Sequence, residues 1–390
     1  MPLLDLPPEI LDAIIDELHG NKKSLLRASL ACRAFYPRTR IHLFSVALLR
    51  GKSDCDRLRE LITMAPKLAL HFKSLEIKFT FRTIYISPVD FRALTVIESL
   101  INVTCLSLSS GSWHAMPDSV VSSLQSHSYH TLVIGQHFHF RSMGEICLLV
   151  KNSPDLQEAR IMCSNSGITE ECNMNHSLHF TPAPVTIHID GSQDSAETLM
   201  KLVLSSGPCP FSCTNVDTLS IALEHESTTV LQCLNEYLTR SRRSLKHIRV
   251  THFGPGFRTA SSETLDVSSI EQIVVTVVRI SPLANQISHI LDWWISNLAA
   301  VNENCAIRSI TFKIISLHPE PEEDLSLDWK DLWMRLDACC TSSKMTLLER
   351  VAVTFRSRPR PAEWDTFKTR MEGNFPRLKE LGCEVVLNAM

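Results

Sequence analysis

The chain has 390 residues, enough for more than one domain or for one long array of repeats. Hydrophobic residues make up 44% of it and charged residues 21%, which is typical of a folded soluble protein and excludes a disordered chain. The formal net charge of -3 gives no overall basic field, so we expect no nucleic-acid partner.

No apolar segment is long enough to predict a membrane span. The longest apolar-rich helix pattern, at 287–301, is interrupted by His289, Asp292 and Asn297. The N-terminus has neither the basic region nor the clean apolar region of a signal peptide. The 13 cysteines are odd in number and scattered through apolar patterns, so we expect reduced, buried thiols. These features predict a cytoplasmic or nuclear protein with no membrane partner.

The first fifty residues contain three short apolar groups. The first follows Pro7 and Pro8, which suit a first helical turn, and it repeats at helical spacing. Its members are Ile10, Leu11, Ile14, Ile15 and Leu18. A second helix is predicted from Ser24 until Pro37 breaks it, and a third apolar group at 41–49 closes the segment. A segment of about 50 residues buries little surface alone, so we expect a partner or a neighbouring domain to stabilise it.

Three sequence blocks in this segment stand in a definite order and spacing. They are Leu6-Pro7-Pro8-Glu9-Ile10-Leu11, Leu30-Ala31-Cys32-Arg33-Ala34-Phe35 and His42-Leu43-Phe44. With these blocks, residues 4–50 resemble an F-box, most closely those of the large fungal F-box families. Two positions depart from the family pattern, since Ala31 stands where Val is frequent and Phe35 where Trp is frequent.

The resemblance implies that residues 1–50 are an F-box domain that docks on the Skp-type adaptor of a cullin-RING ubiquitin ligase. The residues that would form or support the docking surface are Leu6, Pro7, Ile10, Leu11, Ile14, Leu30, Cys32, Arg33 and Phe35. An alternative is an amphipathic helical cap, because the terminal repeats of a solenoid need a polar outer face. A cap explains the apolar periodicity but not the sequence blocks.

The remaining residues, 51–390, repeat one short pattern, in which three apolar residues are separated by two positions and then by one. Its copies begin at Phe72, Val103, Tyr129, Leu156, Pro184 (a weaker copy), Val216, Leu245, Ile270, Ile307, Leu348 and Leu378. The alternation within each copy predicts a β-strand. Helical patterns lie between the copies, at 55–65, 91–100, 143–150, 196–204, 230–238, 287–301, 329–339 and 364–371.

A strand followed by a helix, many times over, predicts parallel strands with right-handed crossovers. Each unit cannot bury its apolar face alone, so the units stack. The predicted fold is therefore α/β, with an N-terminal helical F-box followed by a solenoid that resembles leucine-rich repeats and has parallel strands on its concave face. The Asn or Cys ladder of that family is mostly missing, so this resemblance is looser. A doubly wound α/β domain also alternates strand and helix, but the near-constant spacing of the copies disfavours it.

The sequence contains no signature of a catalytic or metal site. It has no Gly-x-Ser-x-Gly elbow, no Walker loop and no Gly-x-Gly-x-x-Gly motif. His137 and His139 form a close pair, as do Cys209 and Cys213, but no second pair stands at the spacing of a zinc site. We therefore predict no catalytic residue, no metal and no cofactor.

The outward-facing strand residues are the best candidates for binding a protein target. The residues predicted to contact a target are Glu76, Lys78, Ser107, Arg249 and Lys313. They are polar, mixed in charge and dispersed, which suits a protein surface better than a small apolar pocket.

The predicted function is that of a non-catalytic substrate-recognition adaptor of an SCF-type ubiquitin ligase. Its partners would be the Skp-type adaptor, the cullin and an unknown protein target. One alternative is a leucine-rich-repeat scaffold or ligand-binding protein with a vestigial F-box. Another is an enzyme of an unrecognised kind, which would need a cluster of perturbed titratable groups in a cleft.

Overall fold

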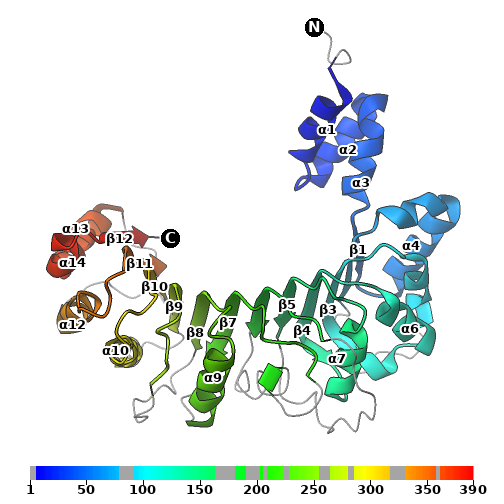
Figure 1. The fold of residues 1–390 in the computed structure, drawn as a ribbon. Coiled ribbons are helices and arrows are strands. Elements are labelled where there is room, and N and C mark those ends of the chain that lie inside the picture. The colour runs from blue at the N-terminus through cyan, green and yellow to red at the C-terminus, as the bar shows by residue number, and fades with distance from the viewer. Residues whose placement is uncertain are drawn as a thin grey trace. The chain divides into compact units, whose positions relative to one another are not determined.

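The computed structural model describes residues 6–78, 92–162, 181–189, 203–204, 209–223, 228–253, 264–279, 285–316, 330–356 and 361–389. These residues belong to two compact units, the first ending at Leu156 and the second beginning at Gln157. Both units are α/β (Figure 1). The strand order is β1-β2-β3-β4 in the first unit and β5 to β12, in chain order, in the second. Every strand pair within a unit is parallel, as predicted.

The first unit begins with an N-terminal helical segment, which comprises α1 (Pro8–Asp16), α2 (Lys22–Ala31), the 3-10 helix η2 (Arg33–Phe35) and α3 (Tyr36–Leu43). Pro7 and Pro8 start α1. Proline lacks a backbone N–H, which costs nothing in the first helical turn because N–H groups there have no partner within the helix. Asn21 caps α2, since its side-chain oxygen accepts a hydrogen bond from the Ser24 N–H at 3.0 Å.

The rest of the first unit alternates strand and helix. Its strands are β1 (Val46–Leu49), β2 (Ser74–Lys78), β3 (Cys105–Ser112) and β4 (Thr131–His139). Its helices are α4 (Lys52–Met64), η3 (Pro66–His71), η4 (Ala93–Ser99), η5 (Trp113–Ala115), α6 (Asp118–Ser126) and α7 (Met143–Val150). The helix predicted at 91–100 thus forms a 3-10 helix over a shorter span.

The second unit continues the alternation. Its strands are β5 (Glu158–Ile161), β6 (Thr186–Ile189), β7 (Thr218–Leu223), β8 (His247–Phe253), β9 (Gln272–Arg279), β10 (Ser309–Ser316), β11 (Arg350–Arg356) and β12 (Glu384–Ala389). Its helices are α9 (Thr228–Arg240), α10 (Asn285–Ala299), α12 (Lys330–Cys340), α13 (Pro361–Glu372) and α14 (Pro376–Glu380). Most of the helix predicted at 196–204 lies outside the described residues.

One face of each sheet is buried beneath helices and the other is open. In the second unit, Ile248 pairs in register with Ile273, and Ile273 with Ile310; all three are at most 1% exposed. Their strand neighbours alternate to the other side, where Arg249 is exposed. Figure 1 shows the helices of this unit lying along one side of its strands. The repeated apolar pattern therefore supplies the core, and the intervening positions supply the open face.

The last predicted strand, which begins at Leu378, is wrong. Leu378 lies in α14, and Leu381 is 69% exposed. The helix forms because Pro376 starts it and because the buried Asp337 carboxylate accepts two of its backbone N–H groups, at 3.1 and 3.0 Å. Gly382, with a φ of 76°, then turns the chain into β12.

The first strand was not predicted. β1 completes a copy of the same pattern, with Phe44, Ala47 and Leu49 at its three apolar positions. Ala47 pairs with Leu75 of β2, and the Phe44 ring lies against Phe72 with centroids 6.2 Å apart. Residues 46–49 therefore extend the sheet, although the sequence placed them with the predicted F-box.

A close approach between β3 and β4 in the first unit requires glycine. The register of β3 and β4 shifts between Leu108 and Ser110, so Ser109 has no register partner on β4. A Cβ atom on Gly135 would lie 2.6 Å from the Ser109 carbonyl oxygen, closer than atoms can pack. No helix in the described part of the chain is long and apolar enough to cross a bilayer.

Candidate functional site

The N-terminal helical segment has a small core of its own. Leu11, Ile15, Leu25 and Phe35 are at most 8% exposed and pack together. The side chains packed around them are Leu6, Leu18, Ala28, Cys32 and Leu43. This core packs α1 and α2 together with η2 and α3, so the backbones of both helices are held in place.

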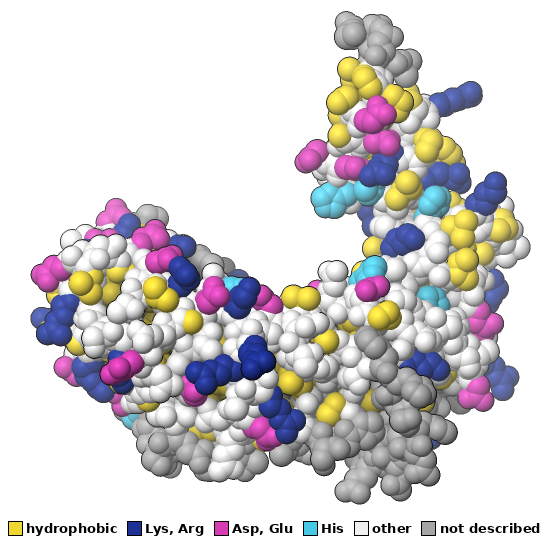
Figure 2. All heavy atoms as spheres, viewed as in Figure 1, with side chains coloured by type: hydrophobic (Ala, Val, Ile, Leu, Met, Phe, Trp, Pro, Cys, Tyr) yellow, Lys and Arg dark blue, Asp and Glu magenta, His cyan; other side chains and the backbone are white. Residues whose placement is uncertain are grey.

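Four large apolar side chains of α1 and α2 point outward. Ile10 and Ile14 lie one turn apart on α1 and are 48% and 41% exposed. Leu26 and Leu30 lie one turn apart on α2 and are 52% and 88% exposed. Figure 2 shows hydrophobic side chains gathered over this segment, among charged ones. Apolar groups so exposed on neighbouring helices are typical of a protein-binding surface.

The nine residues predicted to form or support the adaptor surface divide by burial. The exposed ones are Pro7, Ile10, Ile14, Leu30 and Arg33. Leu11 and Phe35 are buried, and Leu6 and Cys32 are partly buried, so these four can act only by supporting the surface. The Cys32 sulfur also accepts a hydrogen bond from the Ala34 N–H at 3.4 Å.

Sequence reasoning missed other exposed apolar residues of the segment, namely Leu26, Tyr36 and Ile41. Leu26 was detectable, because it precedes Leu30 by one helical turn in a segment already predicted to be helical. The Arg40 guanidinium lies over the aromatic ring of Tyr36, 4.5 Å from the ring centroid, in a cation–π contact.

An ion-pair cluster joins the end of α1 to α3. The Arg38 guanidinium donates from Nε and Nη2 to the two carboxylate oxygens of Asp16, each at 2.6 Å. His42 Nε2 lies 2.7 Å from Asp16 Oδ1. Hydrogen bonds from Arg38 and then from His42 hold the pKa of Asp16 well below its usual range. Asp16 therefore stays ionised at neutral pH, and its contacts with Arg38 and His42 tie the end of α1 to α3.

The five residues predicted to contact a target all lie on open strand faces. Glu76, Lys78 and Ser107 belong to the first unit, where Glu76 pairs in register with Ser107. Arg249 on β8 and Lys313 on β10 belong to the second unit. Lys78 and Arg249 are exposed, and the other three are partly buried.

The open face of the second unit contains a depression of about 230 Å³. It is lined by His188, Thr218, Ser220, His247, Ile248, Arg249, Gln272 and Val274. Its two histidines have acidic neighbours, since His188 lies 3.5 Å from Glu158 and His247 lies 3.3 Å from Asp217. Sequence reasoning found Arg249 but missed the histidines, because only the strand register places them beside it.

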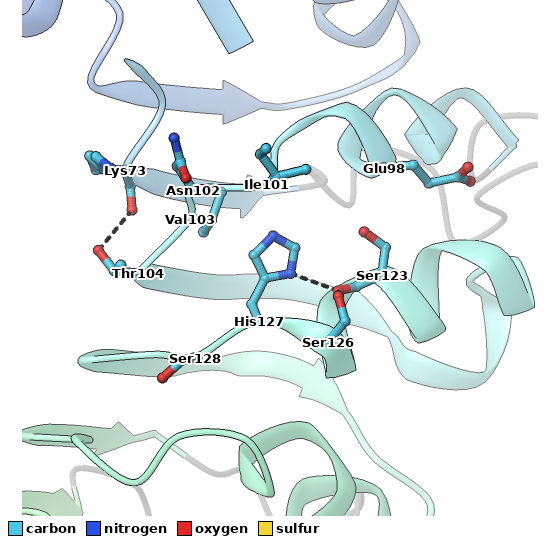
Figure 3. A pocket seen from close by; sticks show the side chains of 10 residues that line it. All are labelled: Lys73, Glu98, Ile101, Asn102, Val103, Thr104, Ser123, Ser126, His127 and Ser128. Atoms are coloured by element: carbon cyan, nitrogen blue, oxygen red, sulfur yellow. Dashed lines mark hydrogen bonds between the residues drawn. The ribbon is translucent and has the colours of Figure 1, made fainter. Parts of the chain in front are cut away.

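A second depression, of about 320 Å³, lies in the first unit (Figure 3). His127 stands in it between the 101–103 segment and Ser123. Its ring nitrogens are committed to carbonyl oxygens, with Nδ1 2.6 Å from Ser123 O and Nε2 2.6 Å from Leu100 O. This histidine therefore links α6 to the segment that precedes β3.

Among the described residues, no group of three or more His, Cys, Asp or Glu side chains is arranged to hold a metal ion. Burial raises the pKa of the Cys55 and Cys339 thiols to about 11. Thiols of this kind are poor nucleophiles.

Comparison with known proteins identifies no relative, since neither the family models nor the curated proteins searched match this sequence. The exposed apolar face of α1 and α2 and the open strand faces are therefore the features from which function is inferred.

Proposed function

We propose that this protein is the substrate-recognition subunit of an SCF-type ubiquitin ligase. Its N-terminal helical segment acts as an F-box that binds the Skp-type adaptor and, through it, the cullin. Its open strand faces bind the protein to be ubiquitinated. The observation that carries the proposal is the exposure of four large apolar side chains, Ile10, Ile14, Leu26 and Leu30, within residues 4–50, the segment that resembles an F-box.

The exposed apolar face favours a permanent partner on physical grounds. Burying a large aliphatic side chain contributes about 1.5–3 kcal/mol, and Leu30 is left almost fully accessible at 88%. A rigid pair of helices loses little conformational entropy on binding, so more of that gain appears as affinity. The Asp16 cluster supplies part of the rigidity, because it joins α1 to α3.

The mechanism is proximity rather than chemistry by this chain. An adaptor that holds a target beside a charged conjugating enzyme raises the effective concentration of the target's lysines. This chain then needs only to bind two proteins, the adaptor and the target.

The test compares the wild-type chain with Ile14→Glu/Leu30→Glu in binding to the purified Skp-type adaptor by calorimetry. Both side chains are exposed, so the fold should be retained. Loss of two aliphatic contacts should weaken binding about a hundredfold or more. The matched control is Leu347→Glu/Leu381→Glu, which changes two exposed leucines of the second unit and should bind like wild type.

Equal adaptor affinity of the wild type and the Ile14→Glu/Leu30→Glu variant would show that this face does not dock on the adaptor. If the wild type itself does not bind the adaptor or recover the cullin from cells, the protein is better explained as a repeat scaffold.

A further inference from the structure

The outward residues of β5 to β12 form rows across the open face of the second unit, because the strands are in register. The first row carries charges of both signs, with Glu158, Arg350 and Glu384. These charges are locally compensated, since Arg350 lies 3.4 Å from Glu384 and Arg160 lies 3.1 Å from Glu158. This row forms the polar edge of the face.

Beyond the first row, the charged outward residues of the described strands are all basic, namely Arg160, Arg249, Lys313 and Arg356. Arg160 is compensated, because its guanidinium lies 3.1 Å from Glu158. Arg249, Lys313 and Arg356 form no ion pair with another described residue. We call these three residues the basic diagonal.

The basic diagonal crosses the strands obliquely. Arg249 of β8 is level with Thr311 of β10, and Lys313 lies two residues further along. Lys313 is level with Thr354 of β11, and Arg356 again lies two residues further along. With strands ~4.8 Å apart and a rise of ~3.3 Å per residue, successive Cα atoms of the diagonal are ~12 Å and ~8 Å apart.

The outward side chains between these cations are small and buried, with Thr276 at 9%, Ala352 at 4% and Thr354 at 5% exposure. A bound polypeptide would therefore contact mainly the longer cationic side chains. Partly buried Val274 adds an apolar contact next to Arg249. Such a face suits a chain with acidic and small apolar residues.

The spacing of the cations matches that of an extended peptide. Side chains on one side of an extended chain recur every ~6.6 Å, so residues i, i+4 and i+6 are separated by ~13 Å and ~7 Å. Acidic residues at those positions would meet Arg249, Lys313 and Arg356 in turn. The depression lined by His247, Ser220 and Arg249 lies at one end of the diagonal and has room for the first carboxylate.

We propose that the basic diagonal binds an extended acidic segment of a protein target through its Asp and Glu carboxylates. This inference rests on the proposed function only where it calls the bound protein a target. Binding of the acidic segment itself requires no component of a ubiquitin ligase. Exposed cations attract carboxylates through screened Coulomb forces, so affinity should fall as salt is added.

The test measures fluorescence anisotropy of labelled peptides with the full chain, without adaptor. The probe is a Ser/Val peptide of about ten residues with Glu at positions i, i+4 and i+6, long enough to span ~33 Å when extended. The comparison peptide has Gln at those three positions. We expect the Glu peptide to bind at least about tenfold more tightly, with an affinity that decreases with salt.

Two triple variants locate the site. Arg249→Gln/Lys313→Gln/Arg356→Gln should weaken binding of the Glu peptide about tenfold or more. The control is Arg242→Gln/Arg243→Gln/Arg370→Gln, which removes the same charge from exposed positions outside the open face and should bind like wild type. Circular dichroism and thermal unfolding confirm that both variants are folded.

Three results would overturn the proposal. They are equal affinity for the Glu and Gln peptides, equal loss of affinity in the two triple variants, and binding that appears only when phosphoserine replaces Glu. The Ile14→Glu/Leu30→Glu variant should bind the Glu peptide normally. Loss of adaptor binding and loss of peptide binding are thus separate outcomes, and either proposal can fail alone.

Discussion

Acidification should destabilise the second unit through His252. This side chain is 1% exposed and its Nε2 accepts a hydrogen bond from Trp294 Nε1 at 2.9 Å. Burial lowers the pKa of His252 to about 3, so the folded protein keeps the ring neutral where the unfolded chain, with an ordinary pKa near 6.5, takes up a proton. Its contribution to stability is therefore complete above pH 6.5 and is lost as the pH falls from there toward 3.

The magnitude follows from the difference in proton binding. The free energy of unfolding should fall by about 1.4 kcal/mol for each pH unit below 6.5, which amounts to about 2.7 kcal/mol at pH 4.5. The assay is urea unfolding followed by tryptophan fluorescence at pH 7.5, 6.5, 5.5 and 4.5. Trp293 and Trp294 both pack on the His252 ring, with centroids 5.8 and 6.2 Å away, so they report on this region.

The comparison variant is His252→Gln, which keeps a hydrogen-bond acceptor for Trp294 but does not titrate. It should lose the part of the pH dependence that His252 causes, while other titrating groups affect both proteins equally. Parallel stability profiles for the wild type and His252→Gln between pH 7.5 and 4.5 would refute the reasoning, because the folded state would then bind protons as readily as the unfolded one.

Two further substitutions test backbone contacts by chemical denaturation. Gly135→Ala should destabilise the first unit by about 1–3 kcal/mol, because its Cβ would lie 2.6 Å from the Ser109 carbonyl oxygen. Gly20→Ala, whose Cβ meets no atom within 4 Å, should be neutral or stabilising, and equal effects of the two would count against the steric argument. Asp337→Ala should cost about 2 kcal/mol, since it leaves two N–H groups at the start of α14 without their acceptor. An unchanged denaturation midpoint would mean that water replaces this cap without loss.

The alternation of strand and helix was predictable because the core repeats with the chain. Leu75, Leu106 and Leu132 stand at equivalent positions of successive copies, and the structure pairs them in register. The pattern failed at Leu378, where a proline and a carboxylate from α12, far away in sequence, favour a helix. The local periodicity of the sequence cannot predict a helix cap that comes from so distant a residue.

The candidate surfaces were predictable to different degrees. Helical spacing placed Ile10, Ile14 and Leu30 in a predicted helical segment. It did not predict which apolar residues of that segment are buried in its small core. The cluster of Asp16, Arg38 and His42 joins residues 22 and 26 positions apart, and no spacing rule predicts it. The basic diagonal likewise depends on strand register, which decides whether dispersed cations are neighbours.

Within each unit, strands that are neighbours in the sheet are also neighbours in the sequence. Duplication or loss of one strand–helix repeat therefore disturbs only the two junctions that flank it. Such an event would shift the cations of the open face by a fixed increment, while α1 and α2 keep the same outward side chains. On the function proposed above, unequal recombination could thus change the set of targets while the helices proposed to bind the adaptor stay the same.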